Sequence, residues 1–174
     1  MKNDQFLFAL LLTLLLATGC AWIPSGGATA QARVEPTAGQ NVRGTVTFTQ
    51  QNELIQVVAS FSGLKPGGHG FHIHEKGDCS APDGTSAGGH FNPGGKKHGL
   101  PGSGEHHVGD LPMLQADQNG KASLTTSLSW LSLGNGDSGI IGRAVVVHAA
   151  PDDFKSQPAG NSGARLACGV IVKR

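Results

Sequence analysis

The sequence has little charge and no pattern of long amphipathic helices. Asp, Glu, Lys and Arg make up 14% of its 174 residues, and the formal net charge is +1. No run of Lys or Arg suggests a phosphate-binding surface, so the composition gives no support for nucleic-acid binding. Outside the N-terminal segment, no stretch has the hydrophobic periodicity of a three-turn helix, and no internal repeat is visible. We therefore do not expect a helical protein.

Long hydrophobic runs are missing except near the N-terminus. Residues 6–16 are apolar and uncharged, follow a short polar start with a lysine, and are too few to span a bilayer comfortably. This arrangement is typical of an export signal. The small residues just before Cys20 resemble a bacterial lipoprotein signal, so we expect residues 1–19 to be removed and Cys20 to be lipidated. The alternative is ordinary cleavage after Ala30, which lies far beyond the apolar stretch.

Cysteine is scarce, with three in the chain. In an exported protein an odd number leaves one thiol unpaired, and lipidation of Cys20 would account for it. Cys79 and Cys168 are then expected to form a disulfide in an oxidising compartment, the alternative being two buried free thiols. Residues 20–32 are small and polar, as in a flexible tether, and we expect one folded domain over 33–174.

What the sequence does contain favours strands joined by turns. It has 27 glycines and nine prolines, and its apolar stretches are short and rich in Val, Ile and Thr. We predict an all-β sandwich or barrel of about eight strands. The strands that the pattern indicates most clearly are 42–50 and 54–61, which form a hairpin, then 69–74, 110–116, 121–128, 140–148 and 166–172.

Histidine is concentrated between residues 72 and 110. Six of the chain's eight histidines fall in this span, which is rich in glycine and ends at Asp110. An irregular region longer than thirty residues, from 75 to about 109, is unusual in a compact domain unless something besides a hydrophobic core orders it. Imidazole is the commonest protein ligand for transition metals, and metal ligation together with a crosslink at Cys79 would supply that order.

The pattern divides into two sets of ligands. His72 and His74 alternate in a predicted strand, so both rings point to one face, and His148 ends another strand that a sheet can place beside them. Nitrogen ligands with an open position favour copper. The second set, His90, His98, His107 and Asp110, offers three nitrogens and one carboxylate, which suit a closed zinc site. His106 is adjacent to His107 and is expected to face away as a non-ligand.

At these residues the chain resembles the copper/zinc superoxide dismutases. The matching segments occur in the family's order and cover most of residues 33–174; they are GFHIHEKGDC at 70–79, SAGGHFNP at 86–93, KKHG at 96–99, HVGDLP at 107–112, GRAVVVHAAPDD at 142–153 and GARLACGVI at 163–171. The resemblance implies an eight-stranded Greek-key sandwich or barrel of immunoglobulin-like architecture with long metal-binding loops.

The resemblance also assigns roles residue by residue. It implies that copper binds His72, His74, His90 and His148, and that zinc binds His90, His98, His107 and Asp110, with His90 bridging the two ions and carrying a proton during turnover. Asp152 would link His72 to His98, whereas Asp153 is expected to be solvated. Arg165 would attract and position the anionic substrate. Cys79 and Cys168 match the family's disulfide.

The activity implied is disproportionation of superoxide to dioxygen and hydrogen peroxide in the cell envelope. The cofactors would be copper and zinc, and the partners would be superoxide and, through the lipid alone, a membrane; a monomer and a homodimer both remain open. A non-catalytic envelope metal-binding protein is the main alternative, and an adhesion-like sandwich leaves the histidines unexplained. The segment between Asp153 and Arg165 is shorter than in the animal enzymes and lacks their paired glutamates and guiding lysine, a role for which Lys155 is the candidate.

Overall fold

The computed structural model describes residues 27–174, which form nine β-strands and one short 3₁₀ turn. The strands are β1 (Thr29–Pro36), β2 (Arg43–Gln51), β3 (Leu54–Ser62), β4 (Gly67–His69), β5 (Phe71–His74), β6 (Leu114–Ala116), β7 (Ala122–Leu128), β8 (Ala144–His148) and β9 (Arg165–Lys173), and the 3₁₀ turn η1 is Thr85–Ala87. The all-β class predicted from the sequence is confirmed.

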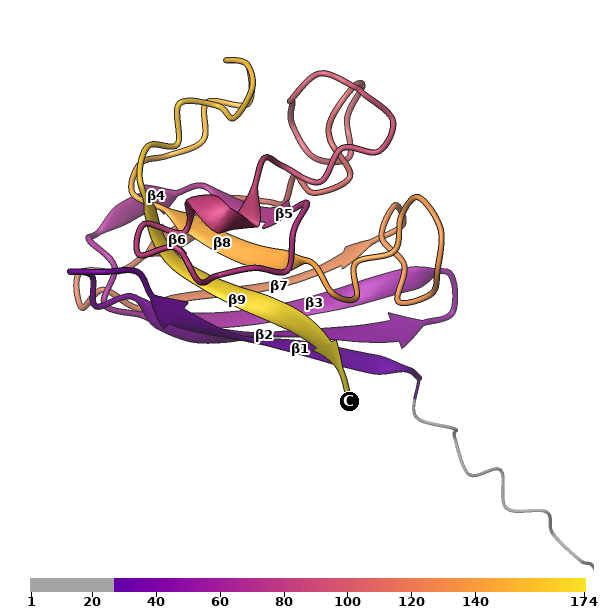
Figure 1. Ribbon diagram of the computed structural model, residues 1–174, viewed down its shortest axis with the longest axis horizontal. Helices are drawn as coiled ribbons and strands as arrows, with labels where there is room; N and C mark the ends of the chain where they lie inside the picture. The colour runs from indigo at the N-terminus through magenta and orange to yellow at the C-terminus, as the bar shows by residue number, and fades with distance from the viewer. Residues whose placement is uncertain (1–26) are drawn as a thin grey trace, which may run out of the picture.

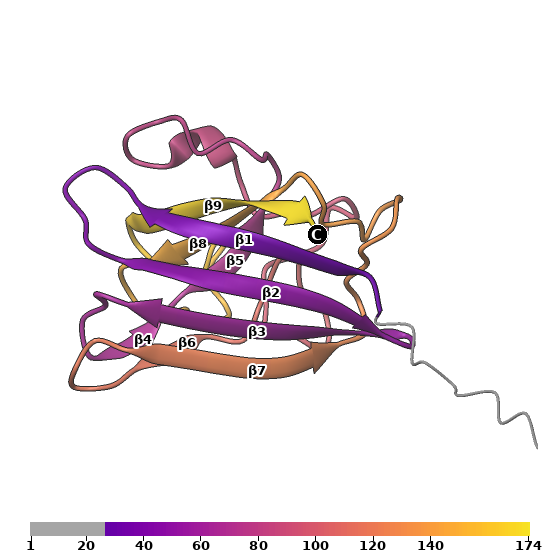
Figure 2. The same ribbon diagram turned by 90° about the horizontal axis from the view of Figure 1, so that it is seen from below.

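The strands form a nearly closed antiparallel barrel. Their order is β4-β6-β7-β3-β2-β1-β9-β8-β5, and every pair of neighbours is antiparallel. The two outermost strands, β4 and β5, are separated in the chain by Gly70 alone, so the sheet curls back almost onto itself. Figure 2 shows β9, β1, β2, β3 and β7 side by side as one layer, with β8 and β5 behind them.

The hydrophobic core fills the space between these layers. Strand β3 alternates buried and exposed side chains over its whole length, which is the period-two pattern read from the sequence. Its inward residues, among them Ile55 and Val57, pack with Phe48 and with Phe71, which comes from the opposite layer. Phe71 also meets the edge of the Phe61 ring at 5.7 Å between centroids.

Strands β5 and β8 are buried on both faces, unlike β3. On one face Ile73, Val145 and Val147 belong to the main core. On the other face Ala144 and Val146 pack beneath the loop that carries Cys79. This second, outward face of the β5–β8 pair is where His72, His74 and His148 lie.

The predicted strand 69–74 is divided at Gly70, which accounts for the ninth strand. His69 pairs with Leu114 of β6, whereas Phe71 pairs with Val147 of β8. Between them Gly70 donates to the carbonyl of Ala150 at 2.9 Å, and a Cβ there would clash with Ser162 Oγ. The chain can change partners at this point because glycine has no side chain.

The N-terminal boundary of the domain lies earlier than expected. Strand β1 begins at Thr29, inside the segment 20–32 expected to be a tether, and Ala30 and Ala32 are fully buried. Small apolar residues at alternate positions of this segment fit between β2 and β9. This alternation is typical of a strand, although the segment as a whole is small and polar. The expected signal peptide 1–19 and Cys20 lie outside the described residues.

Two long loops stand on the β5–β8 side of the barrel, away from β1, β2 and β3 (Figure 1). One connects β5 to β6 and contains η1, and the other connects β8 to β9. The candidate site residues are distributed between these loops and the strands beneath them. Within residues 27–174, no helix has the length and hydrophobicity needed to cross a bilayer.

Candidate metal centre

Strand β5 and strand β8 supply the first three histidines. His72 pairs with Val146 and His74 with Ala144, so the outward face of this pair presents His72, His74 and, at the end of β8, His148. A bulge between Val147 and His148 shifts the register where β8 pairs with β9. The predicted common face of the two alternating histidines is confirmed.

The β5–β6 loop is ordered by pairing with the free edge of β5. Phe91 donates to the carbonyl of Ile73 and Ile73 donates to the carbonyl of Gly109, each at 2.8 Å, and isolated bridges join His74 to His90 and His72 to Asp110. Backbone pairing therefore places His90 and Asp110 beside the strand that carries the first two histidines. The long irregular region is held by this ladder as well as by its ligand residues.

Two clusters of side chains result, and they share His90. In each cluster the potential ligand atoms lie within 4.8 Å of one another, and every member is buried; the first cluster is His72, His74, His90 and His148, and the second is His90, His98, His107 and Asp110. These are the two ligand sets expected from the sequence. His106 belongs to neither, because its ring packs against Trp130 with 4.8 Å between centroids.

The first cluster presents nitrogens to a common centre. His74 Nδ1 donates to the Gly88 carbonyl at 2.9 Å and His148 Nδ1 donates to the Gly163 carbonyl at 3.2 Å, which leaves their Nε2 atoms facing each other at 3.3 Å. His72 Nδ1 and His90 Nε2 are buried and have no hydrogen-bond partner among the described residues. Buried nitrogens that converge without partners are what a cation requires, so this set fits copper.

The second cluster is organised around one carboxylate oxygen. Asp110 Oδ1 lies 2.8 Å from His90 Nδ1, 3.0 Å from His98 Nδ1 and 3.3 Å from His107 Nδ1. Its Oδ2 accepts from the backbone amide of His107 at 2.8 Å, which fixes the orientation of the carboxylate. Three nitrogens and one oxygen at this spacing match the donor set that zinc takes in closed sites.

The protonation equilibria of the clusters differ. Burial lowers the pKa of His148 to about 3 and that of His90 to about 4, and it also lowers the pKa of His74. For His98 burial acts in the same direction, but hydrogen bonds to Asp110 and Asp152 outweigh it and raise the pKa to about 9. Asp110 is also desolvated, yet contacts with the three surrounding histidines lower its pKa and keep it ionised.

Asp152 connects the two clusters. Its Oδ2 accepts from His72 Nε2 at 2.7 Å and its Oδ1 accepts from His98 Nε2 at 2.9 Å. The carboxylate is buried and its pKa is lowered, because these two hydrogen bonds overcome its desolvation. The structure thus places Asp152 where the resemblance expected it, holding one histidine of each set. Asp153 is exposed and hydrogen-bonded within its own loop.

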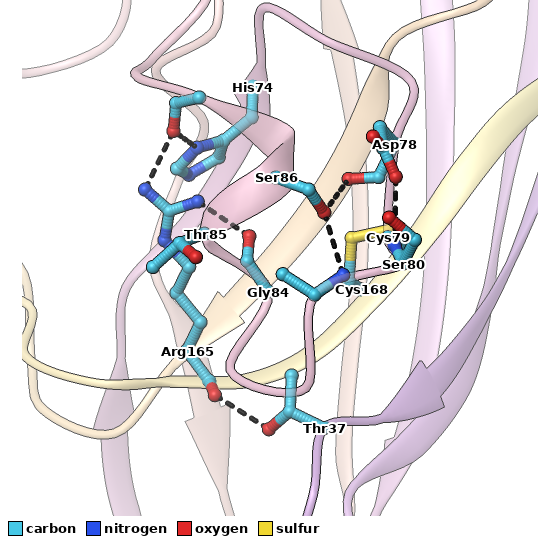
Figure 3. Close-up of a disulfide and its surroundings, with 12 residues drawn as sticks. Thr37, His74, Asp78, Cys79, Ser80, Gly84, Thr85, Ser86, Arg165 and Cys168 are labelled. Atoms are coloured by element: carbon cyan, nitrogen blue, oxygen red, sulfur yellow. Dashed lines mark hydrogen bonds between the residues drawn. A yellow bond between two sulfur atoms is a disulfide. The ribbon is translucent and has the colours of Figure 1, made fainter.

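Arg165 lies next to the first cluster and is held by backbone carbonyls on both sides of η1. Its Nη1 donates to the Gly84 carbonyl at 2.7 Å and its Nη2 to the Gly88 carbonyl at 2.6 Å. Since Gly88 also accepts from His74, one carbonyl fixes the guanidinium relative to a ligand of the first cluster. Figure 3 shows the guanidinium of Arg165 beside the ring of His74. No side-chain pattern signals a main-chain acceptor, so sequence reasoning did not identify these glycines.

A disulfide joins Cys79 and Cys168, as predicted. Figure 3 shows it beside Ser86, whose hydroxyl donates to the carbonyl of Asp78 at 2.9 Å and accepts from the amide of Ala81 at 3.1 Å. The segment that carries η1 is therefore tied to β9, the strand on which Arg165 lies.

Arg143 also supports the site, and its role was not assigned from the sequence. Its Nη1 donates to the carbonyl of Glu75 at 2.7 Å, and its guanidinium lies 3.5 Å from the centre of the Phe91 ring. Phe91 follows His90 and Glu75 follows His74, so Arg143 contacts the residue after each of two ligands, the first through its ring and the second through its carbonyl. Its position just before an apolar strand gave no sign of this contact. Lys155, by contrast, is exposed.

Comparison with known proteins identifies relatives over most of the chain. The family model for copper/zinc superoxide dismutase matches residues 42–171. The protein "Superoxide dismutase [Cu-Zn] 2" of Aquifex aeolicus (strain VF5) is 40% identical over an alignment of 147 residues, which covers 82% of this chain and 85% of that protein. A solved structure titled "Crystal Structure Analysis of the clock protein EA4" superposes with a TM-score of 0.75 at 41% identity, covering 85% of this chain and 96% of the other.

Proposed function

We infer how this protein works from one established point: the chain belongs to the copper/zinc superoxide dismutase family, as the match over residues 42–171 and the 40% identity to a relative show. Its reaction is the disproportionation of superoxide to dioxygen and hydrogen peroxide. The observation that carries this function in the structure is the pair of buried clusters that share His90. Both clusters have their full set of ligands, whereas a β-sandwich without catalytic function need keep only the fold.

The two ions have different tasks. When bound among His72, His74, His90 and His148, copper supplies the one-electron chemistry, and zinc in the second cluster supplies fixed positive charge without redox change. The protein's contribution is to place the ring nitrogens and to exclude other orientations of the rings. Hydrogen bonds from His74 and His148 to backbone carbonyls, and from His72 to Asp152, set the orientation of each ring before a metal binds.

His90 is proposed to hold a proton during turnover. Its Nδ1 faces Asp110 in the second cluster at 2.8 Å, while its Nε2 is buried and faces the first cluster without a hydrogen-bond partner among the described residues. A proton carried on Nε2 would therefore point into the first cluster, where superoxide would react. The formation of hydrogen peroxide requires such a donor next to the reacting anion.

Arg165 is proposed to attract and orient superoxide. Its guanidinium is fixed by Gly84 and Gly88, and its remaining donors have no hydrogen-bond partner among residues 27–174, so they are available to a small anion. Lysine carries the same charge but lacks the planar fork that reaches two carbonyls at once.

The experiment that tests this function is a dismutation assay on protein loaded with copper and zinc, with the metals counted. We expect catalysis by the wild type, a drop in kcat/KM of about tenfold or more for Arg165→Ala and a smaller drop for Arg165→Lys. Loaded wild-type protein that binds both ions in these clusters but does not dismutate superoxide would contradict the function. Equal rates in all three proteins would contradict the role of Arg165.

We also propose that the protein acts in the cell envelope, attached by a lipid on Cys20. Three observations support this: the apolar segment 6–16 that ends just before Cys20, the disulfide, and the position of β1. Cleavage after Ala30 would remove Thr29 and Ala30 from β1, and with them the pairs to Thr49, Phe48 and Lys173. Cleavage before Cys20 leaves β1 whole.

A further inference from the structure

The shortened loop between β8 and β9 contacts the zinc cluster through a residue outside the ligand sets, Gln157. Its Oε1 accepts from the backbone amide of His98 at 2.9 Å, and its Nε2 donates to the carbonyl of the same residue at 2.9 Å. One side-chain amide thus satisfies both main-chain groups of a zinc ligand. Among residues 27–174, no other group donates to the His98 carbonyl or accepts from its amide.

The segment that carries Gln157 is stiffened from within. The side chain of Asp153 accepts from the amides of Lys155 and Ser156, from the Ser156 hydroxyl and from the side chain of Asn161. The backbone closes the same segment through Gly160, which donates to Ser156 at 2.7 Å and accepts from Asp153 at 3.0 Å. Gln157 therefore projects from a fixed base, although Gln157 and much of the loop are exposed.

The same loop also holds the ring of His98. Asp152 accepts from His98 Nε2 at 2.9 Å and from His72 Nε2 at 2.7 Å. Gln157 therefore forms hydrogen bonds with the backbone of His98, and Asp152 forms one with its imidazole. Both contacts come from the β8–β9 loop. A displacement of the His98 backbone would move its ring relative to the carboxylate.

We propose that Gln157 is a positioning residue, which holds the backbone of His98 so that this zinc ligand, Asp152 and His72 keep one fixed geometry. The proposal rests on the assignment of the second cluster to zinc. The family resemblance gives the ligands and Asp152, whereas Gln157 belongs to the segment in which this chain departs from the animal enzymes. In this protein the short loop then serves to fix the metal centre.

The physical reason is the burial of His98, which is 3% exposed. A buried amide and a buried carbonyl without partners are unfavourable, so loss of the Gln157 side chain forces the backbone to move or admit water. Either response loosens the ring that Asp152 orients. Groups that orient a metal ligand in this way typically change metal affinity by about tenfold to a hundredfold when they are removed.

The test compares Gln157→Met, which keeps the length of the side chain and removes both hydrogen bonds, with the matched control Gln118→Met in the exposed β6–β7 turn. We expect the Gln157 variant to bind zinc about tenfold more weakly in competition with a chromophoric chelator. In metal-free protein we expect faster hydrogen exchange at the His98 amide. The control should match the wild type in both measurements.

A second variant, Gln157→Glu, retains an acceptor for the His98 amide and loses the donor to its carbonyl. Its His98 amide should therefore exchange close to the wild-type rate, well below the rate of the Met variant. Wild-type exchange and zinc affinity in Gln157→Met would overturn the proposal, as would equally fast exchange in the Met and Glu variants. Hydrogen exchange is measured without metal or substrate. The exchange rates therefore test the role of Gln157 even if the protein shows no dismutase activity.

Discussion

Several histidines of the metal centre use one ring nitrogen to hold the ring in place and the other as a potential metal ligand. His72, His74, His98 and His148 each use one ring nitrogen to donate to a carbonyl or carboxylate, and direct the other to a cluster. The outer hydrogen bonds fix both the tautomer and the ring plane. Replacing one ligand should therefore remove a metal without collapsing its neighbours.

His148→Ala tests this separation at the copper cluster. His148 belongs to the first cluster only, so we expect copper-dependent dismutation to be lost while zinc content stays close to one ion per chain. Metal analysis and a superoxide assay on the same preparation provide the measurement. Full activity in this variant would refute the copper assignment, and loss of both metals would refute the independence of the two clusters.

The pKa of His98 predicts how zinc binding depends on pH. Because the pKa is raised to about 9 in the folded chain, its protonated form contributes stability below its ordinary value of 6.5, and this contribution is lost as the pH rises through about 9. Zinc must displace that proton, so zinc affinity should rise about tenfold per pH unit between pH 6.5 and 8. His90 and His148, with pKa values of about 4 and about 3, are already neutral in this range.

A chelator titration at pH 6.5, 7.2 and 8.0 measures this slope for zinc in copper-free protein. Copper binding to zinc-free protein serves as the comparison, and its affinity should change much less over the same range. A zinc affinity that is flat between pH 6.5 and 8 would show that His98 does not hold the proton.

At the scale of elements, the centre depends on loops attached to a strand edge. Strand β5 pairs with β8 on one side, and on the other side it receives the short segments around His90 and Asp110. The disulfide between Cys79 and Cys168 then fixes the η1 segment, whose glycine carbonyls hold Arg165.

Removal of this disulfide should affect both stability and catalysis. A crosslink with a sequence separation of 89 residues is expected to contribute roughly 2–5 kcal/mol through the denatured state. We expect Cys79→Ser/Cys168→Ser to lower the free energy of unfolding of the metal-free protein by that amount, measured by urea denaturation. Its kcat/KM should also fall, because the η1 segment is freed; an unchanged kcat/KM would show that Arg165 is held without the disulfide.

The sequence predicted the strands in which polar and apolar residues alternate over a long stretch, but it did not predict where strands are shortened or divided. The hairpin at 42–50 and 54–61 is observed as β2 and β3 with a change of about one residue at the ends. The predicted strand 110–116 is reduced to Leu114–Ala116, since Pro112 cannot donate to a ladder, and the division at Gly70 depends on a change of partner. Spacing predicted the members of both ligand sets except for the sharing of His90, which the family resemblance implied. Gly88, Arg143 and Gln157 act through three-dimensional contacts that leave no periodic signal.

At the scale of the whole molecule, the barrel separates the metal centre from the N-terminal end of the domain. Figure 1 shows β1 on one side of the molecule and the two long loops on the opposite side. The order in which nine strands pair could not be predicted from local patterns, because it depends on contacts between distant segments. An anchor at Cys20 would leave the loops facing away from β1 and open to a small anion.

The proposed anchor is tested by Cys20→Ser. We expect the wild type to fractionate with membranes and to carry the mass of a lipid on its first residue, and the variant to lose both properties while keeping its specific activity. Mass spectrometry of the membrane-extracted protein gives the decisive value. A mature chain that begins after Ala30 and carries no lipid would contradict the anchor.

The shared imidazole of His90 is the feature on which the account depends most. Anomalous diffraction from a crystal loaded with copper and zinc, recorded at both absorption edges, locates each ion separately. We predict a copper peak among His72, His74 and His148 and a zinc peak among His98, His107 and Asp110, with the His90 ring between them. Both metals at one position, or a His90 ring turned away from either ion, would contradict the account.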